Sequence, residues 1–290
     1  MATMKRAQQM TLAKLAAVGD VAKLRDGISD IVDAGDKTKR GTWSYFASKF
    51  GDWLDAEMPE DTPFSVWSLQ GNTKLPFANF STAPVVTCPG AGACALDGWC
   101  YSFKGWRYPA AFLRQLQNTL LLTKSAGRRI VAKKTNELPA GIDCRLYVDG
   151  DFATLAQVAF WMSAINSRSD LRVYGYSKSW RQLLEYDKIG GLWPDNYCLN
   201  LSNGGNAEHL RDDVARLPIV RGNFLTVDID KRLAGKYGTT AYKAAVRQAA
   251  AKAGIQRPFV CPGKCGECTP KGHFCGRSET SGVDVVIGVH

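Results

Sequence analysis

The chain has 290 residues, a net charge of +10, and 45% apolar and 22% charged residues. This composition excludes a disordered, collagen-like or low-complexity protein, and the length suits one large domain or two small ones. No apolar run is long enough to span a membrane, and the N-terminus lacks the apolar region of a signal peptide. We therefore expect a soluble, cytoplasmic protein without membrane contact, whose positive charge favours anionic partners without naming one.

The first part of the chain is predicted to be helical. Residues 4–35 carry apolar positions at helical spacing with a break at Gly19, and residues 43–58 form a second amphipathic stretch. We expect these helices to form an N-terminal extension, residues 1–75, in front of an α/β domain of residues 76–290.

Strands and helices alternate after the helix that Pro109 opens. The expected strands are residues 144–148, 171–174, 197–201 and 224–227, and the expected helices between and after them are residues 152–165, 179–186, 207–217 and 240–253. Helices between successive strands predict parallel pairing with right-handed crossovers, and therefore an α/β fold.

Polar side chains gather where these strands end, and functional residues of parallel sheets lie at that edge. The residues at the strand ends are Asp149, Gly150, Asp151, Tyr176, Ser177, Lys178, Ser202 and Asn203. We predict that six of them line a cofactor pocket: Asp149, Gly150, Asp151, Ser177, Ser202 and Asn203. Each is also an ordinary turn or helix-cap residue, so a purely local role stays open.

Seven of the nine cysteines fall into two short groups, and clustered thiols in a reducing cytosol usually hold metal. The first group is Cys88, Cys94 and Cys100, in a loop whose glycines Gly90, Gly92 and Gly98 accept a positive φ. The second group is Cys261, Cys265, Cys268 and Cys275. All seven are predicted metal ligands, whereas the isolated Cys144 and Cys198 are predicted to pack in the core.

Spacing alone does not fix the metal. The second group also suits a four-cysteine zinc site, with His273 as a substitute ligand. Together with the charge of +10 and the basic stretch at residues 124–134, such a site supports an alternative, a zinc-stabilised nucleic-acid-binding protein without catalysis. The basic stretch is equally explained as a solvated helix face. A third reading is a scaffold whose metal only stabilises the fold.

Three segments carry a resemblance to a known family. They are the cysteine loop from Thr87 to Gly105, the run Tyr147-Val-Asp-Gly-Asp-Phe152, and the run Tyr174-Gly-Tyr-Ser-Lys178. Over about residues 80–280 the chain resembles the "gene product 88"-like proteins of bacteriophages. More distantly it is similar to radical S-adenosylmethionine enzymes, which place three cysteines after the first strand of a partial (β/α) barrel, with an aromatic residue where Trp99 stands.

These resemblances imply a partial (β/α) barrel and one or two [4Fe–4S] clusters, with S-adenosylmethionine as a cofactor of an open cluster. Three thiolates leave one iron open and four close the cluster, so seven cysteines fit an open cluster plus a closed one. The seven cysteines fit equally well a single cluster that uses only some of them as ligands. The leading hypothesis is a phage iron–sulfur protein, a redox carrier or a radical enzyme, acting with a redox partner or a small-molecule substrate that the sequence does not name.

Overall fold

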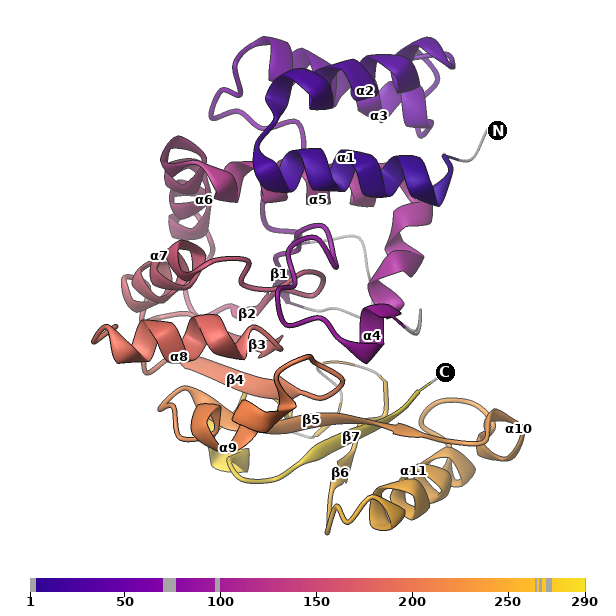
Figure 1. The fold of residues 1–290 in the computed structure, drawn as a ribbon, viewed down its shortest axis with the longest axis vertical. Coiled ribbons are helices and arrows are strands. Elements are labelled where there is room, and N and C mark those ends of the chain that lie inside the picture. The colour runs from indigo at the N-terminus through magenta and orange to yellow at the C-terminus, as the bar shows by residue number, and fades with distance from the viewer. Residues whose placement is uncertain are drawn as a thin grey trace.

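Seven parallel strands form a single sheet in the part of the chain that the structure describes (Figure 1). The structure is a computed structural model and describes residues 4–69, 77–96, 100–263, 265, 268–269 and 273–289. The strands are β1 (Ala78–Asn79), β2 (Asp143–Leu146), β3 (Arg172–Ser177), β4 (Tyr197–Ser202), β5 (Val220–Asp228), β6 (Phe259–Val260) and β7 (Val285–Val289). The predicted α/β class and parallel pairing are confirmed.

The strand order is β1-β2-β3-β4-β5-β7-β6, so the first five strands lie side by side in chain order. A (β/α) barrel has this sequential order. Among the described residues no pairing joins the outermost strands β1 and β6, and the sheet that they bound has barrel-like order. The short strands β1 and β6, and β7 near the C-terminus, were not predicted.

The N-terminal helices are α1 (Arg6–Val18), α2 (Val21–Asp33) and α3 (Trp43–Asp55). The predicted break between the first two is confirmed, since Gly19 adopts the left-handed conformation with φ 70° that ends α1. These helices stack above α5 (Pro109–Thr123), at the end of the molecule away from β6 and α11 (Figure 1). Their apolar residues share one buried cluster with residues of α5 and the sheet. The division into two parts at residue 75 stays a prediction.

The remaining helices follow or connect the strands. They are α4 (Ala93–Leu96), η1 (Tyr101–Arg107), α6 (Ser125–Asn136), α7 (Leu155–Asn166), α8 (Trp180–Lys188), η2 (Glu208–Leu210), α9 (Arg211–Val214), α10 (Lys231–Ala234), α11 (Thr240–Lys252) and η3 (Ser278–Thr280). The helix expected over residues 207–217 is much shorter, since only Arg211–Val214 is α-helical after the short η2. Pro218 limits any extension at the C-terminal end, because it disfavours helical backbone at Leu217. Helix α7 begins at Leu155 rather than 152, because the Thr154 hydroxyl caps its N-terminus through the Gln157 N–H.

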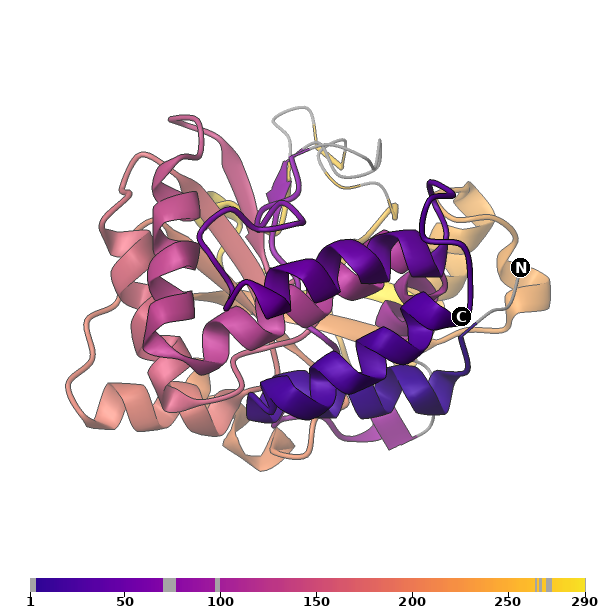
Figure 2. The same cartoon turned by 90° about the horizontal axis from the view of Figure 1, so that it is seen from above.

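The two faces of the sheet have different surroundings. Alternate residues of the central strands, such as Leu146, Val173 and Leu199, join the cluster that contains α7 and α8. The opposite face we call the cysteine face, because Cys261, Cys265 and Cys275 pack against it. Its residues are Arg145, Tyr174, Tyr176, Cys198, Phe224 and Val285. Figure 2 shows part of this C-terminal segment, in yellow, beside β1 in purple.

Candidate functional site

The first cysteine loop follows β1 and lies across the carboxyl ends of β3 and β4. Its backbone forms an antiparallel bridge between Ala91 and Gly205. The Asn206 side chain donates to the carbonyls of Pro89 and Ala91, at 2.9 and 3.2 Å. This loop therefore stands at the edge of the sheet where the sequence predicts a site.

Glycine is required in this loop for close approach rather than for a positive φ. A Cβ on Gly90 would lie 1.7 Å from the Lys178 carbonyl oxygen, and one on Gly92 would lie 2.7 Å from the Gly205 carbonyl carbon. Neither residue is among the positive-φ glycines, so the expected left-handed backbone is wrong for both. Gly98 lies outside the described residues. Backbone of β3 and β4 thus touches the loop directly, with no room for a side chain.

Asp151 and Ser177 are brought together with Cys88. One carboxylate oxygen of Asp151 accepts from Phe152 N and Ser177 Oγ, both at 2.8 Å, and the other accepts from Lys178 N at 2.7 Å. Burial raises the pKa of Asp151, and these hydrogen bonds oppose the shift. Burial also raises the pKa of the Cys88 thiol, and the Asp151 carboxylate raises it further. The carboxylate therefore ties β2 to β3 beside the thiol.

Asp149 lies beside Cys100. The Gln115 amide donates to its carboxylate at 2.9 Å, and burial raises the pKa of both Asp149 and the Cys100 thiol. The turn is sharp because Gly150 has φ 84°, and a Cβ there would lie 1.9 Å from the Thr82 hydroxyl oxygen. Two predicted carboxylates and two predicted thiols thus share this edge.

Ser202 and Asn203 serve the sheet itself. The Asn203 amide oxygen accepts from the Thr226 N–H and hydroxyl, at 2.8 and 2.9 Å, and its Nδ2 donates to the Thr226 carbonyl at 2.9 Å. These bonds fasten the end of β4 to β5 and use both the oxygen and the nitrogen of the amide. Ser202 is buried at the same strand end. A cofactor role for this pair stays a prediction.

The four C-terminal cysteines line one small cavity of about 20 Å³ on the cysteine face. Cys261, Cys265, Cys268 and Cys275 surround it together with Tyr174, Tyr176, Phe259, His273, Phe274 and Val285. Burial raises the pKa of Cys261 to about 12 and that of Cys275 to about 11, and the neighbouring thiols raise both further. The sequence prediction that this group converges is therefore consistent with the fold.

The first cysteine group does not contribute to the cavity that the second group lines. None of Cys88, Cys94 and Cys100 lines it. In the part of the chain that the structure describes, no three Cys, His, Asp or Glu side chains are arranged to hold one metal ion as they stand. Cys144 is fully buried on the opposite side of the sheet, as expected for a core thiol, whereas Cys198 is only half-buried on the cysteine face.

Polar residues inside the strands support this cavity, and sequence reasoning missed them. The Asn200 amide donates to the Cys275 carbonyl at 3.0 Å, and Arg221 Nε donates to the Asn200 amide oxygen at 2.7 Å. The Tyr174 side chain is 2% exposed, and its hydroxyl has no hydrogen-bond partner among the described residues. The sequence feature that could have identified them is a polar residue within an otherwise apolar strand.

Arg145 connects the surroundings of the two cysteine groups. Its guanidinium stands 4.6 Å from the centre of the Tyr176 ring and donates to the Tyr101 hydroxyl at 3.2 Å. Tyr101 directly follows Cys100, and Tyr176 lines the C-terminal cavity. One partly buried cation therefore lies between two sets of thiols that are far apart in the sequence.

His273 forms an ion pair on this face that predicts a pH dependence of stability. Its Nε2 lies 3.0 Å from Asp143 Oδ2, and this bond, with help from Arg172, lowers the pKa of Asp143 to about 2. A depressed carboxyl pKa stabilises the fold above the usual value of about 3.9, and the stabilisation is lost as pH falls through about 2. Urea unfolding at a series of pH values should therefore show a shallower acid loss in Asp143→Asn than in the exposed control Asp195→Asn. Equal slopes would contradict the role of this pair.

The basic stretch at residues 124–134 forms α6 and uses several of its charges locally. Lys133 pairs with Glu60, Lys134 with Glu137, and Arg128 donates to the Leu122 carbonyl. Ile130 and Val131 face the core. A solvated helix face accounts for these contacts, and nucleic-acid binding by this helix stays a prediction.

The fold and the site together define a thiol-rich α/β protein with a sequentially ordered parallel sheet, one cysteine group at its carboxyl edge and another on one face. Residues 51–278 match the family described as Gene product 88, and the chain belongs to this family of phage proteins. The match begins inside α3, earlier than the resemblance noted from residue 80. No curated protein and no solved structure matches the chain. None of the helices in the described residues is both long and apolar enough to cross a membrane.

Proposed function

We propose that this phage protein is an iron–sulfur protein whose C-terminal cysteines hold a closed [4Fe–4S] cluster. The observation that carries the proposal is the single cavity lined by Cys261, Cys265, Cys268 and Cys275. Four thiolates complete the coordination of such a cluster, which then transfers electrons.

The chemistry of the donors fits the cluster. Because burial raises the pKa of Cys261 and Cys275, their thiols are protonated at neutral pH and would release protons on binding iron. The thiols stand around a common space without the close grouping that one ion requires, and a cube binds each thiolate through a different iron. The space is only about 20 Å³, so binding a cube requires the loop with Cys265 and Cys268 to move outward.

The residues around the cavity suit a negatively charged group. The Tyr176 hydroxyl lowers the pKa of the Cys275 thiol, and the Phe274 N–H donates to the Cys268 sulfur at 3.2 Å. Both donors would stabilise thiolates, and such hydrogen bonds raise the potential of a cluster. Arg145 places a partly buried positive charge on the same face.

The finer part of the proposal concerns the first group. Cys88, Cys94 and Cys100 follow the first strand of a sequentially ordered parallel sheet, which is the position of the cysteine loop in radical S-adenosylmethionine enzymes. We propose an open cluster there that supplies an electron to bound S-adenosylmethionine. Asp151 and Ser177 hold the strand ends beneath this loop, and Asp149 lies next to Cys100. The substrate or redox partner is a small molecule or protein of unknown identity.

Anaerobic purification followed by iron and sulfide analysis tests the proposal. The expected result is a brown protein with about eight irons and about eight sulfides per chain when both clusters are present. Electron paramagnetic resonance of the reduced protein then tests the finer part, since S-adenosylmethionine should shift the signal only of an open cluster. An unshifted signal would limit the function to electron transfer.

The competing candidate is a zinc-stabilised nucleic-acid-binding protein. A cavity of about 20 Å³ lined by four thiols favours it, because a modest inward movement of the loop would surround a single ion. It predicts zinc without labile sulfide, and binding to DNA that weakens steeply as salt increases. A colourless zinc protein would therefore replace the iron–sulfur proposal.

A further inference from the structure

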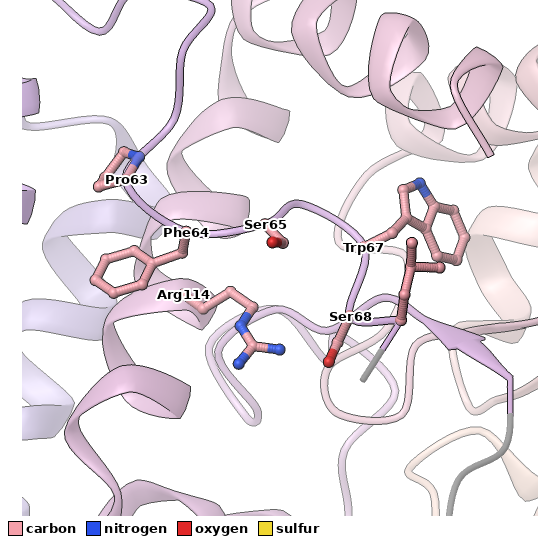
Figure 3. Close-up of a pocket in the computed structure, with 7 residues that line it drawn as sticks. Pro63, Phe64, Ser65, Trp67, Ser68 and Arg114 are labelled. Atoms are coloured by element: carbon pink, nitrogen blue, oxygen red, sulfur yellow. The ribbon is translucent and has the colours of Figure 1, made fainter. Parts of the chain in front are cut away.

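A pocket separate from both cysteine groups lies between α5 and the segment that leads to β1. Its volume is about 480 Å³, within the range of roughly 300–1,000 Å³ typical of small-molecule sites. The residues that line it are Pro63, Phe64, Ser65, Trp67, Ser68, Leu69 and Arg114. Figure 3 shows the Arg114 side chain reaching into the space bounded by Ser65 and Ser68.

Hydrogen bonds from α5 and α6 preform the wall of this pocket. The Gln117 amide binds both the N–H and the carbonyl of Phe64, at 3.0 and 2.9 Å. The Asn118 amide donates to the Val66 carbonyl at 3.0 Å, and the Trp67 indole N–H donates to the Thr135 hydroxyl at 3.0 Å. The wall is therefore fixed before any ligand binds, which lowers the entropic cost of binding.

Arg114 lines the pocket without a counter-ion among the residues that the structure describes. It makes no hydrogen bond or ion pair with any residue that the structure describes, and burial alone lowers the pKa of its guanidinium. A partly buried cation without a partner costs free energy, and proteins usually satisfy such groups. Its planar fork of N–H donors matches the oxygens of a carboxylate or a phosphate.

We propose that this pocket binds a small organic anion whose carboxylate or phosphate pairs with Arg114 and whose apolar body lies against Pro63 and Phe64. The Ser65 hydroxyl stands on the same side as the guanidinium and offers a further donor to the anion, and Ser68 lines the same side of the pocket (Figure 3). The proposal is independent of the iron–sulfur proposal, because no cysteine lines this pocket.

Isothermal titration calorimetry on the full chain tests the pocket. The probes are two organic anions, benzoate and phenyl phosphate, and the neutral analogue benzamide. Inorganic phosphate is added to test whether the pocket binds any small anion or requires one with an organic body. We expect at least one organic anion to bind more tightly than both benzamide and inorganic phosphate, and Arg114→Met to weaken it by at least about tenfold. The comparison of benzoate with phenyl phosphate decides between carboxylate and phosphate.

Two further variants make the result specific. Arg129→Met removes an exposed arginine of α6 and should leave the affinity within about twofold, because surface charges contribute little. Arg114→Lys keeps the positive charge but lacks the planar set of guanidinium N–H donors, so this variant should bind the organic anion with intermediate affinity. The melting temperature of ligand-free Arg114→Met should be no lower than that of the wild type, since the substitution removes no hydrogen bond or ion pair to a described residue.

Equal binding of benzoate and benzamide, undiminished binding by Arg114→Met, or no binding of either organic anion at millimolar concentration would overturn the proposal.

Discussion

Gly90→Ala should destabilise the folded chain by about 3 kcal/mol and detach the first cysteine loop from the sheet. The new Cβ would stand 1.7 Å from the Lys178 carbonyl oxygen, which belongs to the backbone at the end of β3 and cannot turn aside. Relief requires the loop to move away, and the bridge between Ala91 and Gly205 would then be lost. Urea denaturation measures the change in the free energy of unfolding.

Gly105→Ala is the matched control for this prediction. A Cβ on Gly105 would meet no atom within 4 Å, and this residue lies in the short helix η1 just after the same loop. Its replacement should leave stability unchanged or raise it slightly. If Gly90→Ala costs no more than Gly105→Ala, the loop is not held against β3 as described. In the protein that carries its iron–sulfur clusters, Gly90→Ala should also remove the electron paramagnetic resonance signal of the open cluster, which S-adenosylmethionine is expected to shift.

The double variant Cys265→Ser, Cys268→Ser should lose about four irons and about four sulfides per chain, and leave the rest in place. Both thiols line the C-terminal cavity, and a cluster left with Cys261 and Cys275 alone is insufficiently coordinated. Iron and sulfide analysis of the anaerobically purified variant measures the loss. Unlike the glycine substitution, this change should leave the signal of the open cluster intact.

Cys198→Ala is the control for the double variant. Cys198 lies on the same face of the sheet but does not line the cavity. Its removal should leave the iron content unchanged. If Cys198→Ala loses as much iron as the double variant, the ligands are assigned to the wrong thiols. If neither variant changes the iron content, the C-terminal cavity holds no cluster.

Sequence patterns predicted most of the regular structure because the signals were local. Gly19 ends α1 through its own backbone conformation, and Pro109 begins α5 because its fixed φ suits a first helical turn. The alternation of strands and helices predicted parallel pairing. Strands of two residues, such as β1 and β6, are too short to produce a hydrophobic pattern, and their pairing is visible only in three dimensions.

The candidate site was predicted in part. Asp149, Asp151 and Ser177 lie at the edge of the sheet where the topological argument places them, beside the first cysteine loop. Asn203 satisfied the same argument, yet the oxygen and the nitrogen of its amide both bond to Thr226 and join β4 to β5. A position at the end of a strand therefore does not separate a binding residue from a structural one, because both kinds of residue need polar side chains.

The sequence by itself determined most of the helices, the central strands with their parallel pairing, and the two cysteine groups, because these signals lie in residues close together in the chain. Only the tertiary structure decided that Cys261, Cys265 and Cys275 pack on one face of the sheet, and that Arg145 stands between Tyr101 and Tyr176. It also decided that Arg114 enters a pocket in which no described residue is its counter-ion. The Arg145–Tyr101 contact joins residues 44 apart, and the His273–Asp143 contact on the cysteine face joins residues 130 apart. Packing between such distant segments is not encoded in local periodicity.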